Sequence, residues 1–319
     1  MKTQLKMIAV AMTMTATMTA QAAFAAVSLP PVKPAEATGN IVVAGSSTVY
    51  PLTQKIAELF RADGYTGNIT VDNIGSGAGI SRFCRGEIDV ANSSRAMTAA
   101  EITTCKGIGR EPVQFRVGTD GLTIVVSSKN KFVSKLTRKQ IGLIFSGKAK
   151  KWSDVDAKYP AQDIKVFSPG TDSGTYDYFA EEVYKEEKDA KARRAIVAAT
   201  QGIQLSEDDN VLVQGVEGSE FAIGYFGYAY YIENKSKLKA VAYEGVLPSD
   251  ATVPTGKYKF SRPLFIISTG KIMKDKPQVA SFINYYLTNV GKVIKGVGYF
   301  AESDKSLDEA KNAWSGAVK

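Results

Sequence analysis

The sequence predicts an α/β fold made of two lobes, with helices packed on largely parallel sheets. Short apolar runs typical of strands alternate along the chain with stretches whose apolar residues recur at helical spacing. Small polar and glycine-rich loops separate the two kinds of segment. The chain after residue 25 has about 290 residues, which fits two compact units better than one.

Composition limits the chemistry open to the chain. Of its 319 residues, 44% are hydrophobic and 23% charged, as in ordinary globular proteins; it has no histidine and only two cysteines. A Ser-His-Asp or Cys-His catalytic unit, a histidine-containing zinc site and a histidine pH switch are therefore excluded. Any catalysis would depend on carboxylates, lysine, tyrosine or a metal with oxygen ligands.

Residues 1–25 have the pattern of a secretory signal peptide. Lys2 and Lys6 form a basic start, an uncharged run follows, and small residues allow cleavage after Ala22 or Ala25. The alternative, a membrane anchor, is disfavoured because the apolar run is shorter than the roughly 20 residues of a membrane span. No cysteine lies near the cleavage point, so we expect an exported, periplasmic protein without a lipid anchor. The Pro- and Ala-rich residues 26–39 are expected to form an N-terminal tether.

The chain is moderately basic. Its 40 Lys and Arg against 32 Asp and Glu give +8, and loss of the two lysines in residues 1–25 leaves +6. The basic residues are densest between 129 and 151, where a solvated surface is the simplest interpretation. Nucleic acid is not an expected partner, because no stacking aromatic residues or known motif accompany the charge. A mild attraction for small anions remains.

The two cysteines, Cys84 and Cys105, are 21 positions apart. In an exported chain the default is a single disulfide, with two free thiols as the alternative. Such a bridge would contribute ~3 kcal/mol by restricting the unfolded chain.

The first half of the chain begins with a repeated order of strand, polar loop and helix. Strands are predicted at 41–44, 69–74, 88–91 and 122–127. Pro51 lies near the first turn of the helix that follows the first strand, where its missing N–H costs nothing. Residues 75–79 are predicted as a glycine loop before a helix at 80–85. Thr137 and Gln140 form a capping box for a helix at 138–145.

The second half continues the alternation. Strands are predicted at 165–167, 221–231 and 264–268. A helix is expected from about Thr175 through Lys185, and Pro277 opens another with one apolar face. Two further helices are expected to be capped by Ser206 with Asp209 and by Ser306 with Glu309.

Four loops rich in glycine and hydroxyl groups suggest a binding site. They are residues 45–48, 75–79, 92–95 and 171–175. In open α/β sheets ligands bind at the carboxyl ends of strands, where these loops are predicted to lie. Three of them precede helices, whose first N–H groups are free to bind anions. Each alone is more simply a helix cap or tight turn, but together they indicate a site for a compact oxyanion held by neutral donors.

Several motifs resemble one family over residues 41–315. GSSTVYPL at 45–52, IGSGAG at 74–79, DVANSSR at 89–95 and GTDSGTYDYF at 170–179 resemble the periplasmic phosphate-binding component of phosphate ABC transporters. QIGLIFSGK at 140–148 with WSD at 152–154, and DDNVLVQGV at 208–216 with AIGYF at 222–226, are similar to later motifs of that family.

The resemblance implies a type II periplasmic-binding-protein clamshell, each lobe a mixed, mostly parallel sheet flanked by helices. The chain would cross between lobes near residues 118–121 and 262–264, giving lobe I at 40–118 plus 264–319 and lobe II at 119–263. It further implies a monomer that binds inorganic phosphate and delivers it to an inner-membrane ABC permease. No catalytic residue, metal or cofactor is implied.

The resemblance also implies a set of phosphate-binding residues. They are Ser47, Thr48, the Val49 amide, Ser76, Ser94, Arg95, Ser173, Gly174 and Thr175. The chain departs from the best-known members by having Ser94 in place of a carboxylate and Pro169 in place of an arginine. Arg95 is expected to supply the missing cation; the alternative is an ordinary surface arginine.

The loss of the carboxylate affects selectivity. At neutral pH hydrogen phosphate carries a proton and sulfate does not, so a buried acceptor would reject sulfate. With Ser94 there, we expect weaker rejection of sulfate unless Asp120 or Asp172 accepts the proton. A receptor for sulfate, molybdate or tungstate, and a role in sensing or at the cell surface, therefore stay open. A metal-dependent phosphatase is a weaker alternative, because the loops carry hydroxyls rather than carboxylates.

Overall fold

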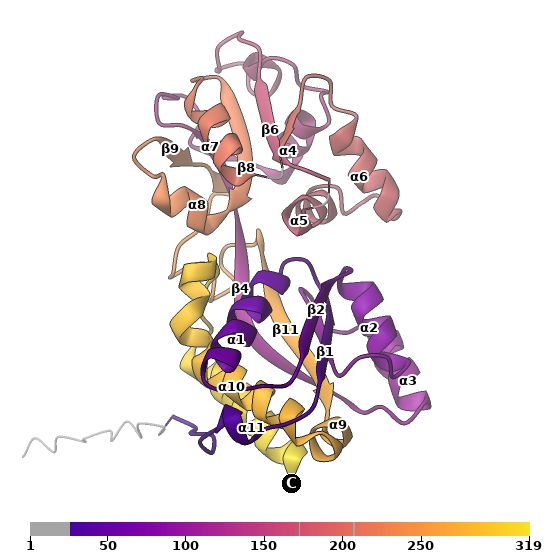
Figure 1. Ribbon diagram of the computed structural model, residues 1–319. Helices are drawn as coiled ribbons and strands as arrows, with labels where there is room; N and C mark the ends of the chain where they lie inside the picture. The colour runs from indigo at the N-terminus through magenta and orange to yellow at the C-terminus, as the bar shows by residue number, and fades with distance from the viewer. Residues whose placement is uncertain (1–25, 172, 207) are drawn as a thin grey trace, which may run out of the picture.

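A computed structural model describes residues 26–319 except residues 172 and 207, so the signal peptide predicted at 1–25 lies outside the described residues. Figure 1 shows two lobes, one above the other, with strand β4 (Pro112–Ser127) running from one into the other and strand β11 (Ser261–Thr269) beginning at their junction. No helix in the described ranges has both the length and the apolar character needed to cross a membrane.

The lower lobe in Figure 1, here called lobe I, carries both chain ends that the structure describes. Its elements are η1 (Pro34–Glu36), β1 (Ile41–Gly45), α1 (Tyr50–Ala62), β2 (Ile69–Asn73), α2 (Ser76–Cys84), β3 (Val90–Ser93), α3 (Ala99–Gly107), α9 (Gly270–Asp275), α10 (Pro277–Val293), η3 (Ile294–Val297) and α11 (Asp304–Val318).

The upper lobe, lobe II, is formed by the middle of the chain. Its elements are β5 (Lys135–Leu136), α4 (Arg138–Phe145), η2 (Trp152–Asp154), β6 (Lys165–Pro169), α5 (Gly174–Val183), α6 (Ala190–Ala198), β7 (Gln204–Ser206), α7 (Asp209–Glu217), β8 (Ala222–Gly227), α8 (Tyr228–Glu233), β9 (Leu238–Ala240) and β10 (Ala242–Tyr243).

The long strands β4 and β11 link the sheets of the two lobes. The strand order is β2-β1-β3-β11-β4-β8-β6-β7, with β9 also on β4, and β10 pairs with β5 apart from this sheet. Pairs among β1, β2 and β3 and among β6, β7 and β8 are parallel, whereas β11 and β4 pair antiparallel to their neighbours. The α/β fold is confirmed, with mixed sheets.

Each lobe has its own hydrophobic core. Phe60, Phe83 and Tyr286 are fully buried in lobe I among side chains of α1, α2 and α10. In lobe II the Phe179 and Tyr225 rings stack with centroids 3.8 Å apart. Separate cores of this size allow the lobes to move as units about the strands that join them.

Residues 26–39 lie along lobe I as a strap. The Val27 amide donates to Asp308 Oδ1 at 3.0 Å, and Asn284 Nδ2 donates to the Pro30 carbonyl at 3.0 Å. Leu29 and Val32 pack against the lobe I core. The segment predicted as a tether is therefore held against α10 and α11.

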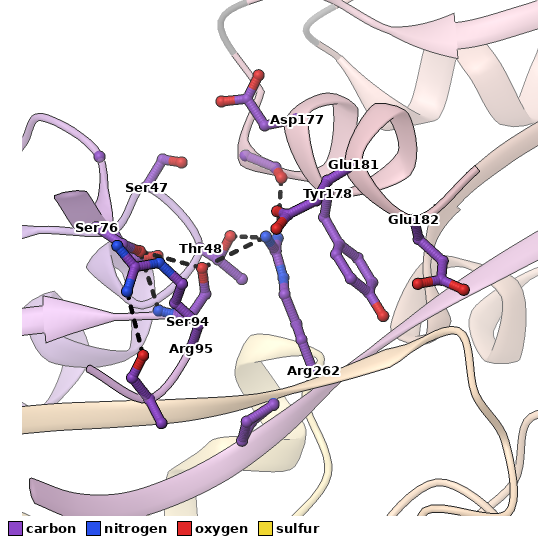
Figure 2. Close-up of a pocket in the computed structure, with 15 residues that line it drawn as sticks. Ser47, Thr48, Ser76, Ser94, Arg95, Asp177, Tyr178, Glu181, Glu182 and Arg262 are labelled. Atoms are coloured by element: carbon purple, nitrogen blue, oxygen red, sulfur yellow. Dashed lines mark hydrogen bonds between the residues drawn. The ribbon is translucent and has the colours of Figure 1, made fainter. Parts of the chain in front are cut away.

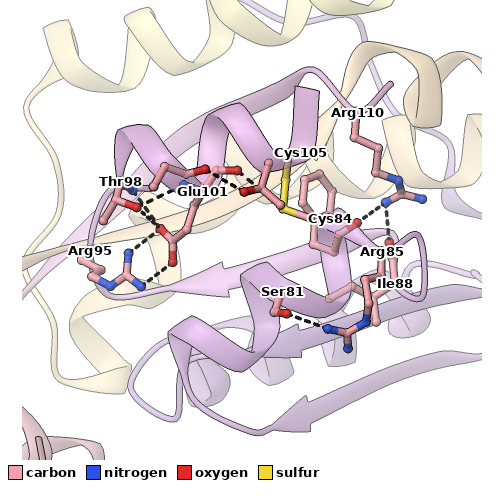
Figure 3. Close-up of a disulfide and its surroundings, with 12 residues drawn as sticks. Ser81, Cys84, Arg85, Ile88, Arg95, Thr98, Glu101, Cys105 and Arg110 are labelled. Atoms are coloured by element: carbon pink, nitrogen blue, oxygen red, sulfur yellow. Dashed lines mark hydrogen bonds and ion pairs between the residues drawn. A yellow bond between two sulfur atoms is a disulfide. The ribbon is translucent and has the colours of Figure 1, made fainter. Parts of the chain in front are cut away.

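A disulfide joins Cys84, the last residue of α2, to Cys105 in α3, which confirms the predicted pairing (Figure 3). Both residues are buried, and their Cα atoms are 4.6 Å apart. The bridge ties together two helices of lobe I whose N-terminal ends approach the interlobe cavity described below.

Several predicted boundaries were wrong. The residues predicted as a glycine loop form the first turn of α2, where Gly79 is needed because a Cβ there would come within 2.5 Å of the Gly45 Cα in β1. The strand predicted at 221–231 ends at Gly227 and continues as helix α8. The strand predicted at 122–127 is the last part of β4.

Helix caps were predicted with mixed success. The Thr137 capping box of α4 is confirmed, since the Gln140 amide donates to Thr137 Oγ1 at 3.2 Å and Gln140 Oε1 accepts from the Thr137 amide. The last helix is instead capped by Ser303, three residues earlier than expected, and α7 is capped by Asp208. In both cases a preceding residue offers an oxygen at the N-cap position.

Candidate anion-binding site

A cavity of about 350 Å³ lies between the lobes, at the carboxyl ends of β1 and β3 and the N-terminus of α5 (Figure 2). It is lined by Ser46, Ser47, Thr48, Gly75, Ser76, Ser94, Arg95, Ala96, Gly174, Asp177, Tyr178, Glu181, Glu182, Arg262 and Pro263. Hydroxyl side chains from three of the four predicted loops line it, together with two arginines and three carboxylates.

The first wall is the turn between β1 and α1. Ser46 and Thr48 are largely buried, and the Ser46 amide donates to the Asn92 carbonyl at 2.9 Å, which fixes the turn on β3. The Val49 amide donates to Ser46 Oγ at 3.4 Å, and the Val49 side chain is fully buried. Ser47 and Thr48 are the residues of this turn that face the other lobe.

Ser76 and Ser94 form the second wall. Ser76 is the first residue of α2, and its Oγ accepts from the Ser94 amide at 3.1 Å and lies 3.2 Å from Ser94 Oγ. One of the two hydroxyls donates to the other, so the second O–H remains free to donate to a ligand. The free N–H groups at the start of α2 add positive potential to this wall.

Arg95 follows Ser94 but is engaged elsewhere. Its guanidinium binds Glu101 in bidentate fashion, at 2.8 and 2.9 Å, in the first turn of α3 (Figure 3). These hydrogen bonds lower the pKa of Glu101 to about 2. Arg95 lines the cavity, but Glu101 compensates its charge.

The third wall is the N-terminus of α5 in lobe II. Ser173 is its N-cap, and Ser173 Oγ accepts from the Thr175 amide at 3.1 Å. Gly174 lies against the first wall so closely that a Cβ on it would be 2.2 Å from Ser47 Oγ and 2.7 Å from Thr48 Oγ1. The two lobes therefore meet at Gly174, and only glycine fits there.

The buried cation of the site is Arg262, at the beginning of β11. One of its terminal nitrogens donates to both Thr48 Oγ1 and the Gly174 carbonyl, the latter at 2.9 Å, and the other lies 3.4 Å from Ser94 Oγ (Figure 2). Its side chain is 9% exposed. Arg262 therefore contacts both lobes from the strand that joins them.

Two neighbours hold the Arg262 guanidinium in place. Asp120 in β4 accepts from Arg262 Nε at 3.1 Å, and the Tyr178 ring lies 4.5 Å from the guanidinium carbon. Burial raises the pKa of Asp120, while the charge of Arg262 opposes the shift. Burial also raises the pKa of Tyr178, so its hydroxyl stays protonated.

Three carboxylates of α5 line the cavity mouth. Asp177 is paired with Arg194, and Glu182 accepts from the Tyr243 hydroxyl at 3.0 Å and pairs with Lys185 at 3.1 Å. Glu181 makes no hydrogen bond or ion pair with any other residue that the structure describes, and its charge contributes to the raised pKa of Arg95. Of the three carboxylates it is the one without a partner among the described residues.

Of the nine predicted binding residues, six line one cavity: Ser47, Thr48, Ser76, Ser94, Arg95 and Gly174. Val49, Ser173 and Thr175 lie beside it, in the turns that shape its walls. Asp172 lies outside the described residues. Asp120 is bound to Arg262 and is not part of the cavity lining.

Sequence reasoning missed Arg262, Tyr178 and the α5 carboxylates. Arg262 is 214 residues away from Thr48, so no local spacing connects them. A signal was present in the helical spacing of Asp177 and Glu181, four residues apart and directly after the predicted loop, which places both on one helix face. Among the described residues no cluster of three or more acidic or cysteine side chains could hold a metal ion.

Fold and site together define a solute-binding protein: two α/β lobes, joined by two strands, enclose a polar cavity to which both contribute donors. The model of a PBP superfamily domain matches residues 31–290. The chain is 41% identical over 283 residues to the protein SphX of Synechococcus elongatus, covering 85% of this chain and 80% of that one. It is 36% identical over 276 residues to the phosphate-binding protein PstS of Staphylococcus aureus, covering 84% and 81%.

Solved structures agree. A possible phosphate binding protein from Planctomyces limnophilus matches with a TM-score of 0.79 and 37% identity, covering 89% of this chain and 100% of that one. An ABC-type phosphate transport receptor from Vibrio cholerae matches with a TM-score of 0.65 and 25% identity, covering 82% and 99%. The chain belongs to the phosphate-binding proteins of ABC transporters, within the periplasmic-binding-protein superfamily. Members of this family are extracytoplasmic substrate-binding receptors and not enzymes.

Proposed function

We propose that this chain captures inorganic phosphate between its two lobes and delivers it to an ABC permease of the inner membrane. The observation that carries the proposal is the convergence of Arg262, Thr48, Ser76 and Ser94 with the N-terminus of α5 on one cavity. A tetrahedral anion has four oxygens to satisfy, and this set supplies hydroxyl and amide donors from both lobes. The names of the relatives support phosphate as that anion.

Binding would replace contacts that now hold the walls together. Arg262 donates to Thr48 Oγ1 and the Gly174 carbonyl, and an anion in the cavity offers it charged acceptors instead. The Arg262 donor is already charged, and an anionic acceptor adds an opposite charge that the neutral Thr48 hydroxyl and Gly174 carbonyl lack, so this exchange favours the occupied, closed state. Ser47, Thr175 and the amides of Val49 and Gly174 complete our proposed donor set.

We further propose that the protein works as a periplasmic monomer, exported by residues 1–25 and free of a lipid anchor, and that it does not bind nucleic acid. The basic start and small-residue cleavage sites support export. The lobe boundaries we propose are 40–118 with 264–319, and 119–263. The separate cores of the two lobes support this division, with Phe300 as the described residue of 264–319 that is buried in the lobe II core.

Glu181 is the residue we propose for selectivity. A carboxylate can accept the proton of hydrogen phosphate but repels sulfate, which has none to offer. Ser94 cannot play this part alone, and Asp120 is already bound to Arg262. The neighbouring Glu182 is held by Tyr243 and Lys185, which makes it a matched control.

Isothermal titration of protein unfolded and refolded to remove bound anions tests the proposal. Phosphate should give a saturable 1:1 isotherm at micromolar concentration. Sulfate, molybdate and tungstate in parallel titrations should bind more weakly. Glu181→Gln should reduce the difference in affinity between phosphate and sulfate, whereas Glu182→Gln should leave that difference unchanged. A folded protein that gives no heat with phosphate would contradict the function; unchanged discrimination in Glu181→Gln would contradict only the role of Glu181.

A further inference from the structure

A short segment after α10 reaches the hinge between the lobes. Residues 298–302, here called the hinge wedge, follow η3 and precede α11. The Phe300 amide donates to the Thr119 carbonyl at 2.8 Å, and the Thr119 amide donates back to the Phe300 carbonyl at 3.0 Å. This antiparallel bridge attaches the wedge to β4 where the strand leaves one lobe for the other.

The wedge is anchored in lobe II although the helices on either side of it belong to lobe I. The Phe300 side chain is 2% exposed and belongs to the hydrophobic core of lobe II. Its ring centroid lies 4.6 Å from that of Tyr228 in α8. A Cβ at Gly121 of β4 would come within 2.6 Å of this ring, so the glycine makes room for Phe300.

The same wedge holds the anion-binding turn of lobe I. The Tyr299 hydroxyl donates to the Thr48 carbonyl at 2.7 Å. Burial raises the pKa of Tyr299, so this hydroxyl remains a donor throughout the physiological range. Tyr299 does not line the interlobe cavity, so its contact with the site is through the backbone of Thr48.

A third attachment fixes the wedge to β4. Thr119 Oγ1 donates to Glu302 Oε1 at 2.7 Å, and Glu302 Oε2 lies 3.0 Å from Arg116 Nε. The Glu302 side chain is only 3% exposed, whereas the Arg116 side chain is 37% exposed, so the carboxylate end of this ion pair is buried at the hinge. The wedge therefore cannot stay still while the backbone of β4 near Thr119 bends.

We propose that the hinge wedge couples bending of the hinge to the geometry of the anion-binding turn, with Tyr299 as its positioning residue. Residues of β4 up to Gly121 pair with β11, and from Leu122 onward they pair with β8. Rotation of lobe II must bend the strand at this change of partner. The wedge follows through Phe300 and Thr119 and moves or holds the Thr48 carbonyl through Tyr299. This inference rests on the proposed anion-binding function.

Tyr299→Phe is the direct test, because it removes one hydroxyl and no packing atom. We expect phosphate affinity to fall about 5- to 10-fold, the loss typical of one well-formed hydrogen bond. The matched control is Tyr285→Phe in α10, which removes a hydroxyl that donates to Asp63 at 2.6 Å, away from the hinge. The control should lose comparable stability and keep its affinity.

A measurement without ligand tests the role of the hinge wedge independently of the proposed phosphate binding. Hydrogen exchange of the stripped protein should speed up at the amides of residues 46–50 in Tyr299→Phe and stay unchanged there in Tyr285→Phe. Phe300→Leu, which keeps an apolar side chain in the lobe II core, should speed up the same amides. If the wild type fails to bind phosphate, the function is wrong, yet exchange still decides the coupling. The inference would be overturned if Tyr299→Phe bound phosphate as tightly as the wild type and exchanged the amides of residues 46–50 at the same rates.

Discussion

Arg262 gives the site a buried charge whose hydrogen-bond acceptors lie on both lobes. A guanidinium is planar and carries five N–H groups in a fixed arrangement, so it can contact Asp120, Thr48 and the Gly174 carbonyl at the same time. The resemblance to the family implies a cation at the position that Pro169 holds here. We propose that Arg262, at the start of β11, supplies that cation from a different element, which is why the motif around residues 170–179 alone did not reveal it.

Replacement of Arg262 by lysine keeps the charge but not this geometry. We expect Arg262→Lys to weaken phosphate binding about 100-fold, since an ammonium cannot reach both lobes and Asp120 together. Arg95→Lys is the comparison, because the Arg95 charge is already compensated by Glu101. Titration calorimetry on both variants measures the difference. A larger loss in Arg95→Lys would return the main cation role to Arg95.

The pairing of Arg95 with Glu101 predicts a dependence of stability on pH. The pKa of Glu101 is held at about 2 in the folded protein, below its ordinary value of 4.5. A lowered carboxyl pKa stabilises the fold above the ordinary value, and this stability is lost as pH falls from about 4.5 towards 2. The side chain is partly exposed, so the contribution is about 1 kcal/mol at most.

Urea unfolding at about pH 5 and about pH 3 measures this contribution. Glu101→Gln should lose less stability between the two pH values than the wild type. Arg95→Met removes the donor, so it should likewise reduce the change in the free energy of unfolding between these two pH values. If the stability of Glu101→Gln depended on pH as that of the wild type does, the ion pair would add no stability in solution.

Residue roles could be predicted from the sequence only where the chain places partners near each other. The hydroxyls at 47, 48, 76 and 94 follow strands or start helices, so their convergence was expected from the way parallel strands end at one edge. Arg262 and Tyr299 act on Thr48 across more than 200 residues of sequence, and pairing across the hinge brings them there. No local pattern contains that information.

At the scale of elements, close packing sets both the helix starts and the glycines. The N-terminus of α5 approaches the turn between β1 and α1 so closely that Gly174 admits no side chain. The capping box of α4 was predictable because its two residues are three apart and interact only with each other. The start of α2 was not, because the helical turn at residues 76–79 depends on how tightly it packs on β1.

Gly174→Ala should separate folding from closure. Its Cβ would lie 2.2 Å from Ser47 Oγ only when the lobes meet, so the isolated helix and the fold should tolerate it. We expect phosphate affinity to fall about 10-fold or more, because overpacking costs about 1–3 kcal/mol. Gly142→Ala in α4 is the control, since its Cβ would have ordinary contacts of 3.5 Å. Unchanged affinity in Gly174→Ala would mean that the contact is absent from the bound state.

At the scale of the whole molecule, ligand binding is coupled to closure of the lobes and to folding. Anything that binds the folded, closed protein and not the unfolded chain stabilises it by mass action. A phosphate concentration about 100 times the dissociation constant should therefore raise the melting temperature by about 5 °C or more. Differential scanning calorimetry in phosphate and in sulfate at equal ionic strength measures the effect. Equal shifts in both would indicate a general response to anions.

The strap formed by residues 26–39 has a practical consequence for sensor construction. It docks on α10 and α11, so the strap and the C-terminus both lie on lobe I, on the side remote from the cavity (Figure 1). Fluorescent proteins fused to both ends would sit on the same lobe and would report little of its rotation against the other. A reporter of phosphate needs one fluorophore inserted in a surface loop of lobe II, with the partner left at either terminus.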